Sequence, residues 1–189
     1  QEVYDYSDSQ RQLVLELQRE LTAIPAFDPA SGGEGEEAKA RYLAGKLADL
    51  GFPEPKWIKA PDPRAPAGYR PSLFTVIPGK DRSRTLWIIS HLDVVPPGDL
   101  SLWNSDPFTL HHNPAKDEDL SFGRGVEANR QGIVSSILAG LACLKLNRAP
   151  ACDLGLMFVA DEETNSEFGV DYILKNRPEL FRPDDLILV

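Results

Sequence analysis

The stretch TLWIISHLDVVPPGD, from Thr85 to Asp99, decides the fold of this chain. Its first six residues are almost all apolar, which predicts a strand buried on both faces of a sheet. A second apolar run, DLGLMFVA from Asp153 to Ala160, leads into DEE and so into the acidic pair Glu162 and Glu163. Open α/β sheets place their sites at the carboxyl ends of strands. We therefore predict that His91 and the two glutamates converge at one edge of a central sheet.

The rest of the pattern alternates helices with strands. A capping box at Ser7–Gln10 predicts the start of the first helix, and Gly51 predicts the end of the second. A long loop is expected from Pro96 to about Asn129. Loops of that length more often have a function than serve only as a connection. The alternation predicts a three-layer α/β architecture in one domain. The other expected elements are helices at Leu13–Ile24, Glu36–Leu50, Gly132–Leu146 and Glu167–Lys175, and strands at Lys56–Lys59, Ser72–Ile77 and Leu186–Val189.

Composition restricts the classes of function. The chain has 189 residues, 42% of them hydrophobic, with a net charge of -9 and a pI near 4.8. An acidic surface disfavours binding to nucleic acid or anionic membranes, and no apolar run approaches the roughly 20 residues that span a bilayer. No signal peptide is visible. Cys143 and Cys152 are too few for a disulfide framework, so a cytoplasmic setting is expected.

The ends of the sequence suggest processing. The chain lacks an initiator Met, and its last residues form an apolar strand. We therefore expect it to be a fragment of a longer protein.

Two groups of residues carry candidate chemistry. Asp93 lies two residues after His91, so in extended backbone both side chains share a face, and a carboxylate behind a histidine is common in metal sites. The alternative is a structural hydrogen bond at a strand end. Adjacent carboxylates such as Glu162 and Glu163 shift each other's pKa, which suits one of them to proton transfer. The alternative is a solvated acidic turn that caps the next helix.

Other catalytic patterns are missing from the sequence. There is no GxSxG nucleophile elbow, neither cysteine has a motif around it, and no phosphate loop or dinucleotide fingerprint occurs. Gly123 and Gly125 predict a tight turn. His111 and His112 are expected to be a solvated pair in a polar loop.

Four segments, in this order, carry a resemblance to a known family. They are SHLDVVPPGD at Ser90–Asp99, the WxxDPF spacing at Trp103–Phe108, GRG at Gly123–Gly125 with the helix after it, and DEE. The ordered set resembles the zinc peptidases that include aminoacylase, carboxypeptidase G, succinyl-diaminopimelate desuccinylase and the cytosolic dipeptidases. The similarity runs from about Asp8 to Val189. It implies an α/β/α zinc-exopeptidase-like (phosphorylase/hydrolase-like) catalytic domain, of which residues 1–189 would be the N-terminal portion.

The resemblance implies a role for each matching residue. His91 would ligate one metal, and Asp93 would support it. Glu163 would ligate the second metal. Glu162 would be the general base that takes a proton from a water bridging the two ions.

One position departs from the family pattern. The bridging aspartate of the family falls on Ala128, three residues after Gly125, where a cis peptide usually follows. Arg130 stands where a lysine or a polar residue is common. A further acidic ligand, a C-terminal histidine and the small inserted domain used for dimerisation are expected to lie beyond Val189.

The resemblance also implies a function. The complete enzyme would hold two zinc ions, with Co or Mn as alternatives, and cleave an amide bond in a short peptide or N-acyl amino acid. The parent would be a homodimer through the absent domain. With Ala128 in place of the bridging ligand, this chain is expected to bind little or no metal and to be inactive.

Three readings remain open at this point. The first is a catalytic domain whose bridging ligand has been removed or lost, and the second is a non-catalytic binding or scaffold protein on the same fold. A nucleotide-binding α/β domain is a third, which the missing phosphate loop disfavours. An incomplete sheet would also expose an edge that invites self-association.

Overall fold

A computed structural model describes residues 1–114 and 119–189, and a five-stranded mixed sheet forms its centre. The sheet strands are β1 (Lys56–Pro61), β2 (Tyr69–Ile77), β3 (Asp81–His91), β6 (Cys152–Val159) and β7 (Leu186–Leu188). Their order is β1-β2-β6-β3-β7. β1 and β2 pair antiparallel, as do β2 and β6, whereas β6, β3 and β7 run parallel. His91, at the end of β3, and the pair Glu162 and Glu163, shortly after β6, therefore lie at the parallel half of the sheet.

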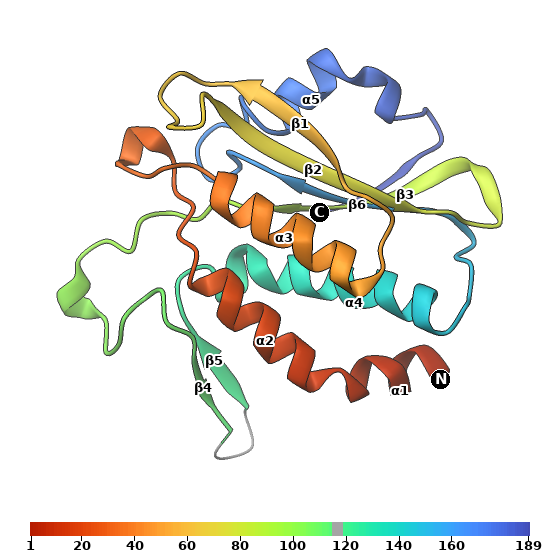
Figure 1. Cartoon of the computed structure of the whole chain (residues 1–189), viewed down its shortest axis with the longest axis horizontal. Helices are drawn as coiled ribbons and strands as arrows, with labels where there is room; N and C mark the ends of the chain where they lie inside the picture. Colours follow the sequence, from red (N-terminus) through yellow and green to blue (C-terminus); the bar gives the residue numbers. More distant parts are fainter. Residues whose placement is uncertain (115–118) are drawn as a thin grey trace.

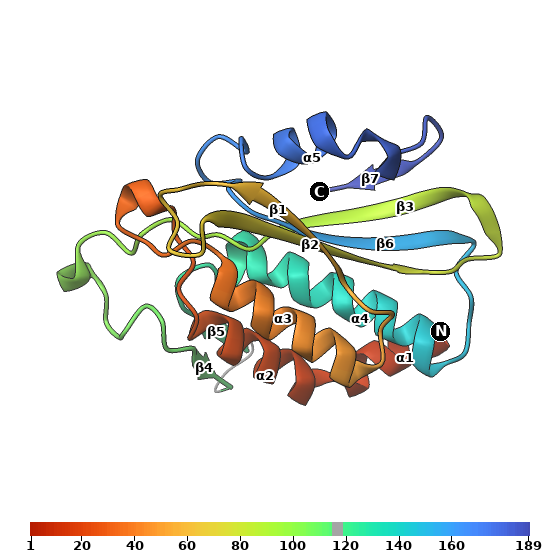
Figure 2. The ribbon, with the colours of Figure 1, turned by 45° about the horizontal axis from the view of Figure 1, so that its top comes forward.

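Helices cover both faces of this sheet. They are α1 (Glu2–Ser9), α2 (Arg11–Thr22), α3 (Glu37–Leu50), α4 (Gly132–Lys145) and α5 (Val170–Asn176). α1 to α4 lie together on one face, and α5 lies on the other (Figures 1 and 2). This confirms the predicted three-layer α/β arrangement. Short 3-10 turns occupy Pro29–Ser31, Leu100–Leu102 and Pro178–Leu180.

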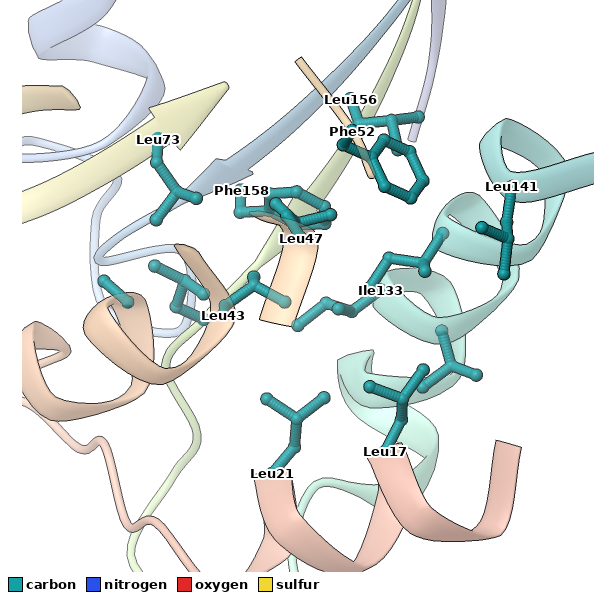
Figure 3. Packing of buried hydrophobic residues seen from close by; sticks show 14 of the residues in the cluster. Leu17, Leu21, Leu43, Leu47, Phe52, Leu73, Ile133, Leu141, Leu156 and Phe158 are labelled. Carbon is teal, nitrogen blue, oxygen red and sulfur yellow. The ribbon is translucent and has the colours of Figure 1, made fainter. Parts of the chain in front are cut away.

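The larger core lies between the sheet and the four-helix face. Apolar side chains at helical spacing on α2, α3 and α4 meet alternate residues of β2 and β6, as Figure 3 shows. The same spacing that predicted the helices thus places their apolar faces on the sheet. A smaller core lies under α5, where Trp87 and Ile89 of β3 meet Ile173. Because Leu86 and Ile88 pack toward the larger core, β3 contacts apolar side chains on both faces, as predicted.

The predicted capping box is wrong. Ser7 and Ser9 lie inside α1, and Gln10 precedes α2 without a side-chain cap. Ser9 Oγ donates instead to the carbonyl of Tyr6, at 2.6 Å. The first turn of α1 carries Glu2, whose negative charge suits the positive end of a helix dipole, so the helix starts earlier than the leucine pattern indicates.

Other predicted boundaries shift by a few residues. β3 begins at Asp81 rather than Thr85 because Asp81 pairs with Cys152 across the sheet. α5 begins at Val170, three residues later than expected. Gly51 ends α3 in the left-handed conformation, with φ of 90°, which confirms the predicted stop.

The long loop contains an element that the sequence pattern missed. β4 (His111–Asn113) pairs with β5 (Leu120–Phe122) as an antiparallel hairpin. The prediction of a solvated histidine pair is therefore wrong for His112. Its Nδ1 lies 3.1 Å from Ser121 Oγ, and its Nε2 lies 3.2 Å from Asp119 Oδ1. Strand pairing across the hairpin, which single-sequence periodicity cannot reveal, places these side chains together.

The cysteines and helices add two further observations. Cys143 and Cys152 are both free and half-buried. Among residues 1–114 and 119–189, no helix has both the length and the apolar content required to cross a membrane.

The β7 edge is apolar and exposed. Within the described residues no strand pairs with its outer side, and Leu186, Ile187 and Leu188 are between 51% and 57% exposed. Unpaired apolar edges template association between chains. We expect a protein of these 189 residues to self-associate, and Ile187→Lys to reduce its average mass in multi-angle light scattering. Tyr4→Lys, an equally drastic change on exposed α1, is the control; a monomeric starting protein would contradict the expectation.

Candidate metal centre

Two parallel strands bring the predicted residues together. β3 and β6 are neighbours, and His91 at the end of β3 pairs in register with Val159 at the end of β6. The turn after β6 carries Glu162 and Glu163. His91, Glu162 and Glu163 can each offer one ligand atom, and these atoms lie within 4.8 Å of one another. The convergence that the strand ends predicted is confirmed.

His91 is buried and has a defined orientation. Its Nδ1 lies 3.0 Å from the backbone carbonyl of Asp93, and because a carbonyl only accepts, Nδ1 carries the proton in this hydrogen bond. Nε2 faces Glu162 Oε2 at 3.6 Å. The lone pair of the neutral ring therefore points to the acidic side of the site, as metal ligation requires. Burial lowers the pKa of His91, but Asp93 and Glu162 outweigh it and the net shift is upward.

Asp93 acts differently from the sequence-based expectation. Its carboxylate lies 3.5 Å from His91 Nδ1, but the hydrogen bond from the ring goes to the main chain of Asp93. The carboxylate accepts the backbone N–H groups of Glu162, at 3.1 Å, and of Glu163, at 2.9 Å. Burial raises the pKa of Asp93, and the His91 ring and these two amides overcome that effect and lower it.

The two glutamates occupy different environments. The Glu162 side chain is 50% exposed and reaches over His91. Glu163 is more buried, and that burial raises the pKa of its carboxyl group. Both backbone amides are fixed by Asp93, so the turn holds the two carboxylates close to the imidazole.

A buried charge network lies behind this turn, and sequence reasoning did not identify it. The Arg70 side chain on β2 is 0% exposed. Its guanidinium binds both carboxylate oxygens of Glu36, donates to Asp28 Oδ2 at 2.5 Å, and lies 3.5 Å from Asp161 Oδ1. Asp161 has φ of 65° and precedes Glu162, so Arg70 contacts the start of the acidic turn. The motif DEE was the only available signal for Asp161.

The GRG loop supplies the third side of the site. Gly125 has φ of 75°, and a Cβ there would lie 2.4 Å from Val94 Cγ1, so the tight turn requires glycine. A cis peptide bond joins Ala128 to Asn129, as the resemblance implied. Ala128 and Glu163 line a common cavity of about 210 Å³. Ala128 therefore stands beside the candidate ligand Glu163 but offers no ligand atom itself.

The buried side chain of Arg130 connects this loop to α2. It is 1% exposed, and its Nε donates to the carbonyl of Leu21 in the last turn of α2, at 2.9 Å. Burial, and next the charge of Arg124, lower the pKa of Arg130 to about 10. Arg124 itself stacks on Trp103, with its guanidinium carbon 5.1 Å from the ring centroid. The loop is thus tied to α2 on one side and to the 96–110 segment on the other.

The donor set fits a divalent ion. One imidazole nitrogen and carboxylate oxygens from Glu162 and Glu163 form an N/O group of the type that zinc accepts. Asp93 orients the histidine from the other side through its carbonyl, which is the usual arrangement behind a ligating imidazole. The three donor atoms lie close enough together to contact a bound ion. An arrangement in which His91 and Glu163 each hold a different ion would need a bridging ligand, which Ala128 does not provide.

Sequence comparisons place these residues in a family context. The profile of peptidase family M20/M25/M40 matches residues 87–188. Over 181 residues the chain is 39% identical to an uncharacterized metallohydrolase of Methanocaldococcus jannaschii, covering 93% of this chain and 43% of that protein. Over 170 residues it is 30% identical to the succinyl-diaminopimelate desuccinylase of Paracidovorax citrulli, covering 85% and 39%. The chain thus spans less than half the length of these relatives.

Solved structures share the same fold. A di-peptidase of Saccharomyces cerevisiae superposes with a TM-score of 0.75 at 24% identity, covering 92% of this chain and 37% of that chain. Human carnosine dipeptidase 1 superposes with a TM-score of 0.74 at 20% identity, covering 98% and 40%. At these identities the likeness shows the fold alone. Because the family profile matches more than half of the sequence, the chain belongs to peptidase family M20/M25/M40.

Proposed function

We propose that residues 1–189 carry part of the active site of a metal-dependent amide hydrolase that acts on short peptides or N-acyl amino acids. The observation that carries the proposal is the convergence of His91, Glu162 and Glu163 at the ends of two parallel strands. Family membership and metallohydrolase relatives imply the use of divalent metal ions. The relatives named above are a desuccinylase and dipeptidases, which supports an amide bond as the target.

Each residue has a proposed task. His91 would hold one ion through Nε2, and Glu163 would hold a second. The divalent ions, when bound, would supply a water molecule of lowered pKa and a Lewis acid that polarises the scissile carbonyl. Glu162, half exposed beside His91, would accept the proton of the attacking water and pass it to the leaving amine. Asp93 would fix the position of the Glu162–Glu163 turn relative to the His91 imidazole.

Ala128 determines what this chain can do by itself. It lines the cavity beside Glu163 where the family's bridging carboxylate would stand. Loss even of groups that only orient ligands commonly costs 10- to 100-fold in metal affinity or activity, and loss of a ligand costs more. We therefore propose that this sequence binds little or no zinc, cobalt or manganese and does not hydrolyse amides.

A second candidate function rests on the same alanine. A non-catalytic binding or scaffold protein could keep the fold and the remaining site residues while lacking the bridging ligand. The codon for position 128 in the parent gene separates the two readings. An aspartate codon supports an inactivated enzyme, and an alanine codon supports the scaffold.

The setting of the longer protein is also a proposal. We propose a cytoplasmic homodimer, assembled through a domain outside residues 1–189, with neither nucleic acid nor membrane as a partner. The net charge of -9 supports the last two points, because anionic surfaces repel such a protein.

The test is restoration of activity in the longer parent protein. Ala128→Asp should give zinc-dependent hydrolysis of a panel of dipeptides and N-acyl amino acids. Adding Glu162→Gln should then lower kcat by about 10²- to 10⁴-fold, because the general base is lost. Glu54→Gln, at an exposed position in the segment between α3 and β1, is the control and should keep the activity. A full-length Ala128→Asp protein without hydrolysis on the panel would overturn the proposal.

A further inference from the structure

The chain leaves the sheet just after His91. β3 ends at His91, and Leu92 N makes one more backbone hydrogen bond to β6, to the carbonyl of Val159 at 2.8 Å. Val94 N donates instead to the carbonyl of Ala26, outside the sheet, at 2.9 Å. The carbonyl of Leu92 remains, and it points into the protein interior.

A buried lysine binds that carbonyl. Lys39 on α3 is 0% exposed, and its Nζ donates to Leu92 O at 2.9 Å. Leu92 is 1% exposed, so water does not replace this donor readily. A buried carbonyl without a partner is unfavourable enough for the peptide plane to rotate in search of one. The amine keeps N–H donors in both of its protonation states, so the contact does not depend on its charge.

The peptide plane in question connects the two parts of the site. The Leu92 carbonyl belongs to the peptide bond that leads into Asp93. A shift of the backbone at Leu92 and Asp93 after loss of this donor would displace the Asp93 carbonyl, which orients the His91 ring, and the Asp93 carboxylate, which holds the amides of Glu162 and Glu163. One side chain on α3 thus controls the orientation of groups on both strand ends.

We propose that Lys39 is a positioning residue of the metal centre, and that its bond to Leu92 sets the geometry of His91, Asp93 and the Glu162–Glu163 turn. The consequence for catalysis rests on the proposed function. The placement itself does not, so it can be tested without metal and without substrate.

The test is nuclear magnetic resonance on the metal-free protein of 189 residues with Lys39→Met. The chain has three histidines, so the ring nitrogen resonances of His91 can be followed separately from those of His111 and His112. We expect the His91 resonances to shift while those of the other two stay in place. We also expect hydrogen-exchange protection of the Glu162 and Glu163 amides to fall by at least about tenfold.

Two references separate positioning from general destabilisation. Amide protection in the core of α4, for example at Leu141, reports global opening and should change less than that of the acidic turn. Lys46→Met removes a lysine of the same helix that pairs with Glu16 and Glu20 and should leave the His91 resonances unchanged.

Unchanged His91 resonances and unchanged protection at Glu162 and Glu163 in a folded Lys39→Met protein would overturn the proposal. If that variant does not fold, Lys39→Gln carries the same test. Its amide is too short to reach Leu92 O from the same backbone, so we expect the same local changes. His91 resonances at their original positions in Lys39→Gln would then refute the role of Lys39.

Discussion

Replacing Arg70 with methionine is expected to lower the free energy of unfolding by about 3–5 kcal/mol, because it leaves buried carboxylates without their cation. Glu36 is 0% exposed and Asp161 is 2% exposed, and both lie against the Arg70 guanidinium. Removing one partner of a buried ion pair is far more damaging than replacing the whole pair with apolar groups. Urea unfolding followed by tryptophan fluorescence at pH 7 measures the change.

The loss should depend on pH in a defined direction. Burial raises the pKa of Glu36 even though Arg70 opposes that shift. Without Arg70 the pKa should rise further. A carboxyl group whose pKa is higher in the folded than in the unfolded protein stabilises the fold at low pH, and that contribution is lost as the pH rises through the folded-state pKa. The deficit of Arg70→Met should therefore be larger at pH 7 than at pH 5.

Two further variants serve as references, one a control at another site and one a conservative change at Arg70. Arg41→Met removes an exposed arginine whose partner is Glu37 on the same helix, and the effect should stay within about 0.5 kcal/mol. Arg70→Lys keeps the charge but loses the two-pronged contact with Glu36, so its unfolding midpoint should fall between those of the original protein and Arg70→Met. An Arg70→Met midpoint equal to that of Arg41→Met would contradict the structural role of the network.

Local sequence patterns were sufficient to predict the central strands and α4. The runs that became β3 and β6 are apolar without interruption, and α4 has its apolar residues at helical spacing, so each element is specified by neighbours in the chain. The ends of two parallel neighbouring strands must meet, which is why His91, Glu162 and Glu163 could be predicted to converge.

Such patterns could not predict which residues support the site. Glu36 and Lys39 lie in the stretch EGEEAKAR, which has the composition of a solvated helix start, and Arg70 lies 34 residues after Glu36. Their burial is decided by where α3 packs on the sheet, not by their own neighbours. The contact between Asp93 and the amides of Glu162 and Glu163 spans about 70 residues and depends on the end of β3 at His91. Charged residues that hold ligand turns therefore look like surface residues until the tertiary structure is known.

Ala128→Asp is expected to raise the zinc affinity of this chain by at least about 100-fold, because it adds a ligand where loss of orienting groups alone costs 10- to 100-fold. The new carboxylate would enter the cavity that Ala128 shares with Glu163. Glu163 already lines that cavity, so an aspartate at position 128 would stand beside an existing candidate ligand. Isothermal titration calorimetry with zinc on the two proteins measures the difference.

The controls for this titration decide between two explanations of weak binding. Gln131→Glu adds the same charge at an exposed position three residues away and should leave the affinity unchanged, because a charge without ligand geometry contributes little in water. His91→Ala in the Ala128→Asp background should abolish the gain. If Ala128→Asp binds no more zinc than the original, ligands outside residues 1–189 govern the centre, and the organisation inferred for this half of it is wrong. If only the Ala128→Asp protein binds zinc, the ligands within residues 1–189 are already in place. The methyl group of Ala128, where a carboxylate would stand, is then the reason that the original protein does not bind zinc.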